Sequence, residues 1–426
     1  MKNVCILFLL VFSTLSCQRK SSPAIVDNKI PIKNQFSEKL DSIYASNPET
    51  VGIMVHLECP NKNISWSGAV GYSNKEEKTK IKINQPVLIA SNTKTFVAAA
   101  ILRLAEENQL LLTATIDNYL SGSTKSLLTK GGYDITSIQI AHLLSHTSGI
   151  NDYIDSREFK DKMVSNRTYK WTREEQIELA VLRMNKLGNA GEKYKYSDAN
   201  YLLLTEIIEV VTHLKYYVAI RKLINFKKHD LNGTWFDSLE ESPKDNNQLA
   251  HQYIGKWGIN SYQLDKSFDL YGGGGLASTS KDLAFFFYKL FNKKIFNTSQ
   301  TIHTLLTKVK SEQKSDTDYR FGIWQSVLNG KTVYGHGGTW GSMVYYVPDM
   351  DLAISVIVLE KDKSSLRIEI AETMISELMT QKKKLKMVLA APIQQQGLVL
   401  SRQGNRPTEK GIGLDYKKLL PPAMYC

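Results

Sequence analysis

Two groups of β-patterned segments, one near each end of the chain and separated by a long helical stretch, most constrain how this sequence can fold. Near the start, "TVGIMVHLEC" and "NISWSGAVGYSN" are rich in β-forming residues and are separated by the turn "PNKN", which predicts a hairpin. Near the end, "FGIWQSVLNGKTVYGHGG", "WGSMVYYVPDM" and "LAISVIVLE" predict three more strands. The simplest arrangement is one sheet closed by the two chain ends.

Helical patterns occupy the rest of this body. A first helix is expected in "FSEKLDSIYAS", another directly after Ser91, and two more in "KDLAFFFYKLF" and "SSLRIEIAETMISELM". From about 113 to 270 the clearest helices are "SIQIAHLLSHTSGI", "TREEQIELAVLRM" and "ANYLLLTEIIEVVTHL". We therefore predict an α+β fold, in which an antiparallel sheet of N- and C-terminal strands has flanking helices and a mostly helical inserted domain at about 113–270.

The two ends of the chain differ from the body, which spans 36–380. Residues 1–16 contain a lysine and a short apolar run, which predicts a signal peptide rather than a membrane-spanning helix. "TLSC" resembles a lipoprotein signal with Cys17 as the acylated first residue, and ordinary cleavage nearby is the alternative. Residues 17–35 are expected to form a tether. Residues 381–426 are basic, lack periodicity and predict a disordered or loosely attached tail.

The charge and the cysteines exclude several classes of function. The formal net charge is +12, but residues 381–426 contribute +7 and residues 1–22 contribute +3, which leaves +2 for residues 23–380. A nearly neutral body with basic ends does not predict a nucleic-acid partner. The cysteines at 5, 17, 59 and 426 form neither a disulfide framework nor a metal set, so we expect no metal and no cofactor.

The most informative chemical motif is the Ser-x-x-Lys of "SNTKTF". Ser91 lies at the start of an amphipathic helix, where backbone N–H groups favour a developing negative charge, and Lys94 lies one turn further on the same face. The alternative is a helix-capping serine beside a surface lysine. The same spacing recurs at Ser278–Lys281 and Ser311–Lys314, but the first of these lysines is followed by an acidic partner and the second stretch is highly polar.

Two further motifs could supply partners for a nucleophilic serine. Tyr196 in "EKYKYSDANY" opens a helix beside lysines and could act as a base, or it could be a half-buried aromatic residue. His336 in "VYGHGGTWGS" ends a strand before two glycines that let a ligand approach the backbone, or it could lie in a hairpin turn. His142 and His146 have the spacing of a zinc pair but lack a third ligand, so a structural role is favoured. "YGGGGLASTS" predicts a tight turn before a capped helix.

In this order, the motifs resemble the serine β-lactamase and penicillin-binding protein family, in its class C and D-alanyl-D-alanine carboxypeptidase branch. The resemblance covers roughly 36–380 and is carried by "SNTKTF", "HLLSHTSGI", "YSDANY", "GGGGLASTSKDLAFF" and "HGGTWGS". It implies a beta-lactamase/transpeptidase-like fold and an exported serine hydrolase that cleaves an amide or ester bond through an acyl-enzyme. The substrate would be a small molecule or peptide derived from the cell wall of a bacterium.

The resemblance also implies roles for individual residues. Ser91 would be the nucleophile, and Lys94 and Tyr196 would share the role of base. The backbone N–H groups of Ser91 and Thr339 would form the oxyanion hole beside Gly338. His336 would stand where many relatives have lysine and would donate a hydrogen bond near Tyr196 and the substrate.

Two departures from the family pattern redirect the expected substrate. Asp198 replaces the usual asparagine, and Gly337 replaces a threonine or serine that often binds a substrate carboxylate. The carboxylate of Asp198 weakens the case for a true β-lactamase, and an esterase for small acyl esters is the close alternative. A protein that reacts with β-lactams but turns over slowly, as a sensor would, is a second alternative. An unreactive relative of the fold is a third. The only membrane contact expected is the lipid at Cys17.

Overall fold

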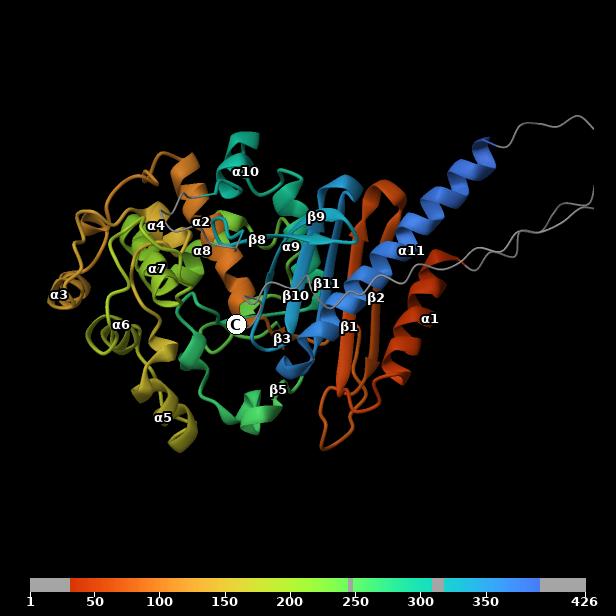
Figure 1. Ribbon diagram of the computed structural model, residues 1–426, viewed down its shortest axis with the longest axis horizontal. Coiled ribbons are helices and arrows are strands. Elements are labelled where there is room, and N and C mark those ends of the chain that lie inside the picture. Colours follow the sequence, from red (N-terminus) through yellow and green to blue (C-terminus); the bar gives the residue numbers. More distant parts are fainter. Residues whose placement is uncertain (1–30, 244–247, 309–317, 391–426) are drawn as a thin grey trace, which may run out of the picture. The chain divides into compact units, whose positions relative to one another are not determined.

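Strands from the two ends of the chain form one six-stranded antiparallel sheet (Figure 1). The computed structural model describes residues 31–243, 248–308 and 318–390, with side chains to 380. The strand order is β2-β1-β11-β10-β9-β8, and β1 pairs with β11, so the predicted closure of the sheet and the α+β class are confirmed. The strands are β1 (Gly52–Cys59), β2 (Ile64–Gly71), β8 (Trp324–Leu328), β9 (Lys331–Gly337), β10 (Ser342–Val347) and β11 (Leu352–Val358).

The C-terminal part of the chain contributes four strands to the sheet, where the sequence predicted three. The segment "FGIWQSVLNGKTVYGHGG" contains both β8 and β9, which pair from Trp324 opposite Gly335 to Leu328 opposite Lys331. The connecting residues Asn329 and Gly330 have φ angles of 49° and 70°. Asn-Gly with two positive φ values is the signature of a two-residue hairpin loop, and it was overlooked in the sequence.

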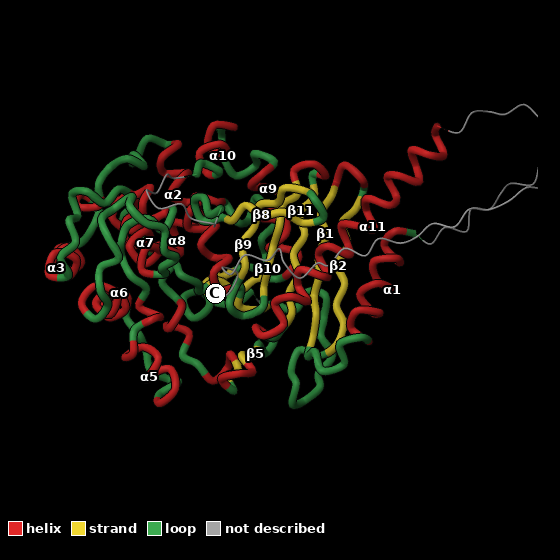
Figure 2. The backbone as a smooth tube through the Cα atoms, in the orientation of Figure 1, coloured by secondary structure: helices red, strands yellow, loops and turns green. Residues whose placement is uncertain are grey.

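Helices cover both faces of this sheet (Figure 2). On one face, α1 (Ile32–Ala45) and α11 (Ser364–Ala390) pack against alternate residues of β1 such as Ile53 and Val55. On the other face lies α9 (Ser280–Phe291), in the same cluster as Met54. Because both faces are covered, β1 and β11 are buried along their whole length and consist mainly of apolar residues.

Two predicted boundaries are corrected by these helices. Helix α1 begins at Ile32, inside the segment expected to be a tether. Helix α11 continues through Ala390, so the boundary at 380 falls inside a helix and the backbone of residues 381–390 is helical rather than a loose tail. The predicted signal peptide, Cys17 and residues 391–426 lie outside the described residues.

The helix that follows Ser91 lies at the centre of the helical part. Helix α2 is buried at nearly every position and packs against α7, α8 and α10. The stretch "SIQIAHLLSHTSGI" forms only the short α4, because the chain turns at His146, where φ is 57°. The helices of this part are α2 (Thr93–Glu106), α3 (Gly122–Lys130), α4 (Ile140–Leu144), α5 (Arg157–Ser165), α6 (Arg173–Leu182), α7 (Ala199–Thr212), α8 (Tyr216–Ile224) and α10 (Ser299–Leu305).

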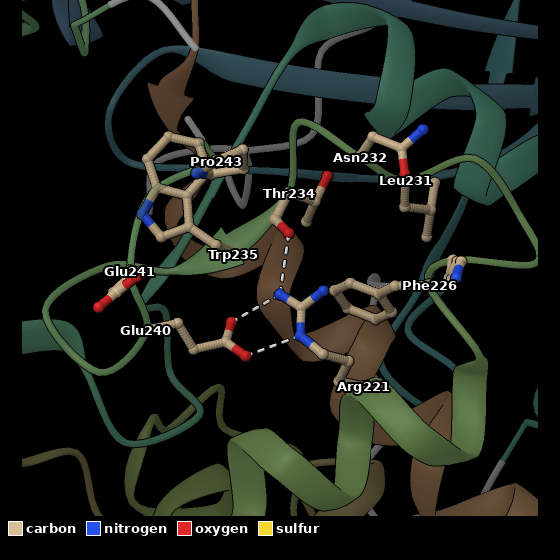
Figure 3. Close-up of a pocket in the computed structure, with 10 residues that line it drawn as sticks. Arg221, Phe226, Leu231, Asn232, Thr234, Trp235, Glu240, Glu241 and Pro243 are labelled. Atoms are coloured by element: carbon tan, nitrogen blue, oxygen red, sulfur yellow. Dashed lines mark hydrogen bonds and ion pairs between the residues drawn. The ribbon is translucent and has the colours of Figure 1, made fainter. Parts of the chain in front are cut away.

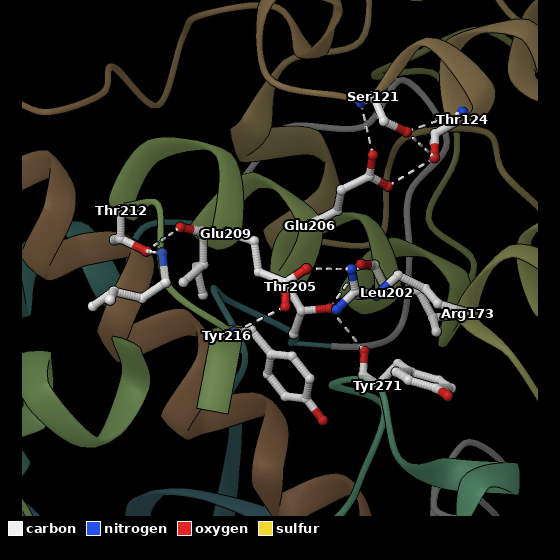
Figure 4. A network of polar contacts seen from close by, with 12 residues as sticks. Ser121, Thr124, Arg173, Leu202, Thr205, Glu206, Glu209, Thr212, Tyr216 and Tyr271 are labelled. Carbon is white, nitrogen blue, oxygen red and sulfur yellow. Dashed lines mark hydrogen bonds and ion pairs between the residues drawn. The ribbon is translucent and has the colours of Figure 1, made fainter. Parts of the chain in front are cut away.

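Polar contacts of α7 hold the surrounding loops in place (Figure 4). The carboxylate of Glu206 accepts hydrogen bonds from the Ser121 N–H at 2.7 Å and from the Thr124 hydroxyl at 2.8 Å, which fixes the start of α3. The Thr205 hydroxyl donates to the carbonyl of Tyr271 at 3.0 Å. Helix α7 therefore anchors the glycine-rich segment that follows Tyr271.

Several short strands that lie outside the six-stranded sheet were not predicted. A three-stranded sheet has the order β3 (Val87–Leu88), β7 (Leu276–Ser278) and β4 (Trp235–Phe236), and a two-stranded sheet joins β5 (Tyr253–Ile254) to β6 (Ile259–Asn260). Two or three residues are too few for a periodic sequence signal. Strand β3 positions the segment that leads directly to Ser91.

Candidate active site

Ser91 is held in a rigid turn between β3 and α2. It is the middle residue of the 3₁₀ turn η2 (Ala90–Asn92), which continues directly into α2. The preceding Ala90 has a φ of 45°, a left-handed conformation that costs a residue with a Cβ about 1–2 kcal/mol. Strained backbone of this kind collects at functional sites, where the surrounding structure enforces it. Ser91 is 5% exposed, so the turn presents a nearly buried hydroxyl.

The amine of Lys94 lies beside this hydroxyl. Lys94 is fully buried, and its Nζ donates to Ser91 Oγ at 3.0 Å and to the carbonyl of Gly273 at 2.6 Å. The third contact is an ion pair with Asp198 Oδ1 at 2.7 Å. The buried amine thus has two hydrogen-bond acceptors and one carboxylate oxygen within 3.0 Å. The structure brings together the predicted Ser91, Lys94 and Asp198.

The Ser278–Lys281 match has no such arrangement. Ser278 is fully buried in β7, where its hydroxyl contacts the hydroxyl of Thr234 at 2.8 Å. Ser311 lies outside the described residues. Within the described residues, a serine–lysine contact at the predicted spacing is seen at Ser91.

Two further carboxyl groups surround the ion pair, and the sequence analysis missed both. Burial and the charge of Asp198 raise the pKa of Asp269 to about 8. The same two causes raise the pKa of Asp152 well above its ordinary value. Both groups are therefore harder to ionise than an ordinary aspartate, and both lie close to the ion pair of Lys94 and Asp198.

The glycine run explains how the chain can pass over these carboxyl groups. A Cβ atom at Gly273 would lie 3.0 Å from Asp198 Oδ2, and one at Gly274 would overlap with the carboxyl group of Asp269. The run is therefore more than the predicted tight turn. It lets the backbone approach close enough for the Gly273 carbonyl to accept from Lys94.

Tyr196 lies over Lys94 in a group of aromatic rings. Lys94 Nζ is 5.1 Å from the centre of the Tyr196 ring. That ring stacks on Trp324 of β8 at 6.3 Å and lies 4.3 Å from the ring of His146. Trp324 was not predicted as a site residue, because a lone tryptophan in a strand gives no signal about the element that it will face.

The two histidines of "HLLSHTSG" have different surroundings. His142 Nδ1 accepts from the N–H of Gln139 at 3.1 Å and caps α4. His146 is buried beside Tyr196, and its Nδ1 accepts from the N–H of Ser197 at 3.2 Å. Among the residues that the structure describes, no three His, Cys, Asp or Glu side chains are grouped to hold a metal ion.

His336 lies near Tyr196 but is arranged differently from expectation. Its Nδ1 lies 2.7 Å from the Gly337 carbonyl, and its Nε2 lies 3.3 Å from the Tyr319 hydroxyl. Burial lowers the pKa of His336 to about 3, so the ring is neutral. Since a carbonyl only accepts, Nδ1 carries the single proton and Nε2 accepts from Tyr319. In this arrangement His336 has no N–H left to donate to a substrate, and the centre of its ring lies 6.3 Å from that of the Tyr196 ring.

The buried neutral state of His336 predicts a pH effect on stability. The pKa is about 3 in the folded chain and near 6.5 in the unfolded chain, so the contribution of His336 is fully present above pH 6.5 and is lost as the pH falls toward 3. The free energy of unfolding of the wild type should therefore fall, relative to His336→Gln, by about 1.4 kcal/mol per pH unit in this window. Chemical denaturation of both proteins at several pH values measures this, and equal pH slopes would contradict it.

The loop after β9 runs beside the turn that carries Ser91. A Cβ atom at Gly338 would overlap with the carbonyl of Ile89, so only glycine allows this approach. The Gly338 N–H donates to the Ser342 carbonyl at 2.8 Å, which closes the loop around Thr339. Thr339 is thereby held in the loop that passes Ser91, as the predicted oxyanion hole requires, and its role stays a prediction.

A separate hollow of about 240 Å³ lies between α8 and β4 (Figure 3). Arg221 faces it and forms two hydrogen bonds of 2.7 Å with the carboxylate of Glu240. Its walls contain none of the predicted site residues.

Of the helices that the structure describes, none is long and apolar enough to cross a bilayer.

Comparison with known proteins places this chain in a family. The model of the family Beta-lactamase matches residues 59–373. The chain is 24% identical to teichoic acid D-alanine hydrolase of Staphylococcus aureus over 83% of this chain and 81% of that protein. It is also 24% identical to penicillin-binding protein 4* of Bacillus subtilis, over 72% and 68%.

Solved structures show the same fold. The D-amino acid amidase of Ochrobactrum anthropi has a TM-score of 0.69 and 20% identity, over 82% of this chain and 99% of that one. The D-stereospecific amidohydrolase of a Streptomyces species has a TM-score of 0.66 and 22% identity, over 80% and 97%. These findings confirm the beta-lactamase/transpeptidase-like fold and the predicted class of enzyme, a serine hydrolase. The chain belongs to the beta-lactamase family, and Ser91, Lys94 and Asp198 meet at the centre of its site.

Proposed function

We propose that the protein hydrolyses an ester or amide bond through an acyl-enzyme on Ser91. The observation that carries the proposal is the 3.0 Å hydrogen bond between Lys94 Nζ and Ser91 Oγ in a buried site. Ser91 Oγ attacks the carbonyl carbon, its proton passes to a base, and the bond to the leaving amine or alcohol breaks. Water then attacks the acyl-enzyme and releases the acid.

The ion pair between Lys94 and Asp198 suggests different roles for the two candidate bases, Lys94 and Tyr196. Lys94 Nζ forms an ion pair with Asp198 Oδ1 at 2.7 Å. In our proposal Lys94 keeps its positive charge within this pair and does not accept the proton of Ser91. In our proposal Tyr196 accepts it as the phenolate, and Lys94, 5.1 Å from the centre of the Tyr196 ring, stabilises that negative charge.

The substrate that we propose is an amide or ester of a small D-amino acid. Three relatives named above are a D-alanine hydrolase, a D-amino acid amidase and a D-stereospecific amidohydrolase, and they support this class. Gly337 supports it independently, because a glycine provides no hydroxyl for the terminal carboxylate of a peptide or a β-lactam. A substrate without such a carboxylate fits this site better.

Gly337→Thr tests this interpretation of the substrate. The nearest atom to a Cβ at Gly337 is the Ser342 carbonyl oxygen at 3.9 Å, so a Cβ at this position makes only an ordinary van der Waals contact. A hydrogen bond to a charged group contributes about 1.5–3 kcal/mol, so acylation by penicillin should become roughly 10- to 100-fold faster. Hydrolysis of p-nitrophenyl acetate, which has no carboxylate, should change little and serves as the control. An unchanged rate with penicillin would argue against the proposed role of this position.

Enantiomeric substrates test the proposed class directly. D-alanine amide and D-alanine methyl ester should be hydrolysed faster than their L-enantiomers by the wild type. The absence of a side-chain hydroxyl at Gly337 also favours the second candidate, an esterase for small acyl esters. Equal rates for the two enantiomers, with rapid hydrolysis of p-nitrophenyl acetate, would favour that esterase. A stable penicillin adduct without turnover of any substrate would favour a sensor.

We also propose that the protein is exported and anchored to the bacterial envelope by lipid on Cys17. The support is the signal-like start and the "TLSC" motif. Mass spectrometry of the mature protein purified from membranes should find diacylglycerol on an N-terminal Cys17. A mature chain that starts elsewhere, without lipid, would contradict the anchor but leave the export proposal intact.

A further inference from the structure

We infer that Gln252 is a positioning residue for the oxyanion hole, an assignment that rests on the proposed function. Gln252 is fully buried. Its Oε1 accepts from the N–H of Leu88 at 2.9 Å, and its Nε2 donates to the carbonyl of Leu88 at 2.9 Å and to the carbonyl of Trp340 at 2.7 Å. One side chain thus joins two backbone segments that are distant in the sequence.

These two segments carry the proposed donors of the oxyanion hole. Leu88 ends β3, which leads through η2 to Ser91. Trp340 directly follows Thr339 in the loop after β9. The spacing between the N–H groups of Ser91 and Thr339 therefore depends on a connection through Gln252, although Gln252 touches neither residue in these contacts.

The side chain of glutamine suits this task through its chemistry. Its amide has two N–H donors and one carbonyl acceptor, and the contacts with Leu88 and Trp340 use both donors and the acceptor. Methionine has a similar shape but offers none of these hydrogen bonds. Asparagine keeps the amide but is one methylene shorter, so it cannot span both segments in the same way.

The backbone of Gln252 is itself fixed, so the side chain has a defined origin. Its N–H donates to the hydroxyl of Ser261 at 3.1 Å, and the N–H of Ser261 donates back to the Gln252 carbonyl at 2.8 Å. The next residue, Tyr253, begins β5 and pairs with Asn260 of β6. A rigid hairpin thus holds the amide against the site.

Other contacts hold the same loop at its ends. The Ser342 hydroxyl donates to the Ile89 carbonyl at 2.9 Å, and the buried guanidinium of Arg367 donates to the carbonyls of Gly338 at 3.3 Å and Ser342 at 3.1 Å. These contacts remain when Gln252 is replaced. We therefore expect the fold to persist and the middle of the loop, at Thr339 and Trp340, to shift.

A shift of this loop should affect catalysis more than binding. Oxyanion donors work at 2.7–3.1 Å from the oxygen, and losing one donor lowers kcat by about 10²–10³-fold in a serine protease. A displaced donor should cost less, so we expect Gln252→Met to lower kcat by roughly 10- to 100-fold. KM should stay within about twofold, because the lost interaction is made mainly in the transition state.

The test compares Gln252→Met with Gln176→Met. Gln176 is also fully buried, and its Nε2 donates to the carbonyl of Phe268 at 2.9 Å, but none of its contacts joins the Ser91 turn to the loop after β9. Thermal melting monitored by circular dichroism checks folding, and kcat and KM are measured with p-nitrophenyl acetate. Gln252→Asn is the second variant, and we expect its kcat to lie between the kcat of the wild type and the kcat of Gln252→Met.

The outcomes separate this inference from the proposed function. A fall in kcat with an unchanged KM in Gln252→Met, and kcat near the wild type in Gln176→Met, supports the inference. It is overturned if kcat is unchanged, if KM alone rises, or if Gln176→Met loses as much. It is also overturned if neither variant of Gln252 folds, because Gln252 would then serve folding rather than positioning. A wild type without Ser91-dependent turnover would instead overturn the proposed function.

Discussion

Replacement of Ser91 by alanine is expected to lower kcat for p-nitrophenyl acetate by at least about 10³-fold, because the covalent route is lost. The turn η2, the strained Ala90 and the hydrogen bond from Lys94 all serve to present this hydroxyl. Removing one buried oxygen leaves those elements in place, so the melting temperature should change little. Initial rates and thermal melts of the wild type and Ser91→Ala measure both effects.

Ser278→Ala is the matched control for this variant. Ser278 is a buried serine in the same Ser-x-x-Lys spacing, but it contacts Thr234 rather than a lysine. Its replacement should leave kcat within a few-fold of the wild type. If Ser91→Ala retained comparable activity, or if Ser278→Ala lost it, the nucleophile would have been assigned to the wrong serine.

Replacement of Lys94 by methionine is expected to affect both activity and stability. Lys94 is fully buried and Asp198 is nearly so, and removing one partner leaves the other charge uncompensated. Breaking a buried pair in this way costs about 3–5 kcal/mol of folding free energy. The activity should also fall by at least about 10²-fold, since the ammonium beside Ser91 and Tyr196 is lost.

A double variant separates these two effects. Lys94→Met with Asp198→Asn removes both charges, so most of the lost folding free energy should return, whereas activity should not. Denaturant unfolding and p-nitrophenyl acetate kinetics on the single and double variants measure this. Recovery of activity together with stability would mean that Lys94 serves folding alone, and our proposal for its role would be wrong.

The parts of the fold that were predicted are those with strong local patterns. The hairpin of β1 and β2 and the helix after Ser91 have clear periodicity, and the turn "PNKN" lies between the two strands. The hairpin of β8 and β9 also had a local signal, the Asn329–Gly330 loop, and it could have been found. Strands β3, β4 and β7 could not, because their pairing is decided by contacts between distant segments.

The same distinction applies to the site. Ser91, Lys94 and Asp198 belong to short motifs, and the structure brings them together. Asp269 and Asp152 belong to no recognisable motif. Asp269 joins the site because the glycine run passes close to Asp198. Asp152 joins it because the segment before η4 (Tyr153–Asp155) also approaches Asp198. The orientation of the His336 ring could not be predicted from the sequence either, since it depends on a contact with the hydroxyl of Tyr319.

The acyl-enzyme on Ser91 is the central claim, and peptide mapping of a trapped adduct tests it most directly. The wild type is incubated with a fluorescent penicillin or p-nitrophenyl acetate, quenched in acid, digested and analysed by mass spectrometry. We predict one acyl group per chain, located on the peptide that contains Ser91 and absent from Ser91→Ala. An adduct on another residue, or turnover of ester by folded protein with no acyl group on Ser91 under any quench condition, would contradict the account.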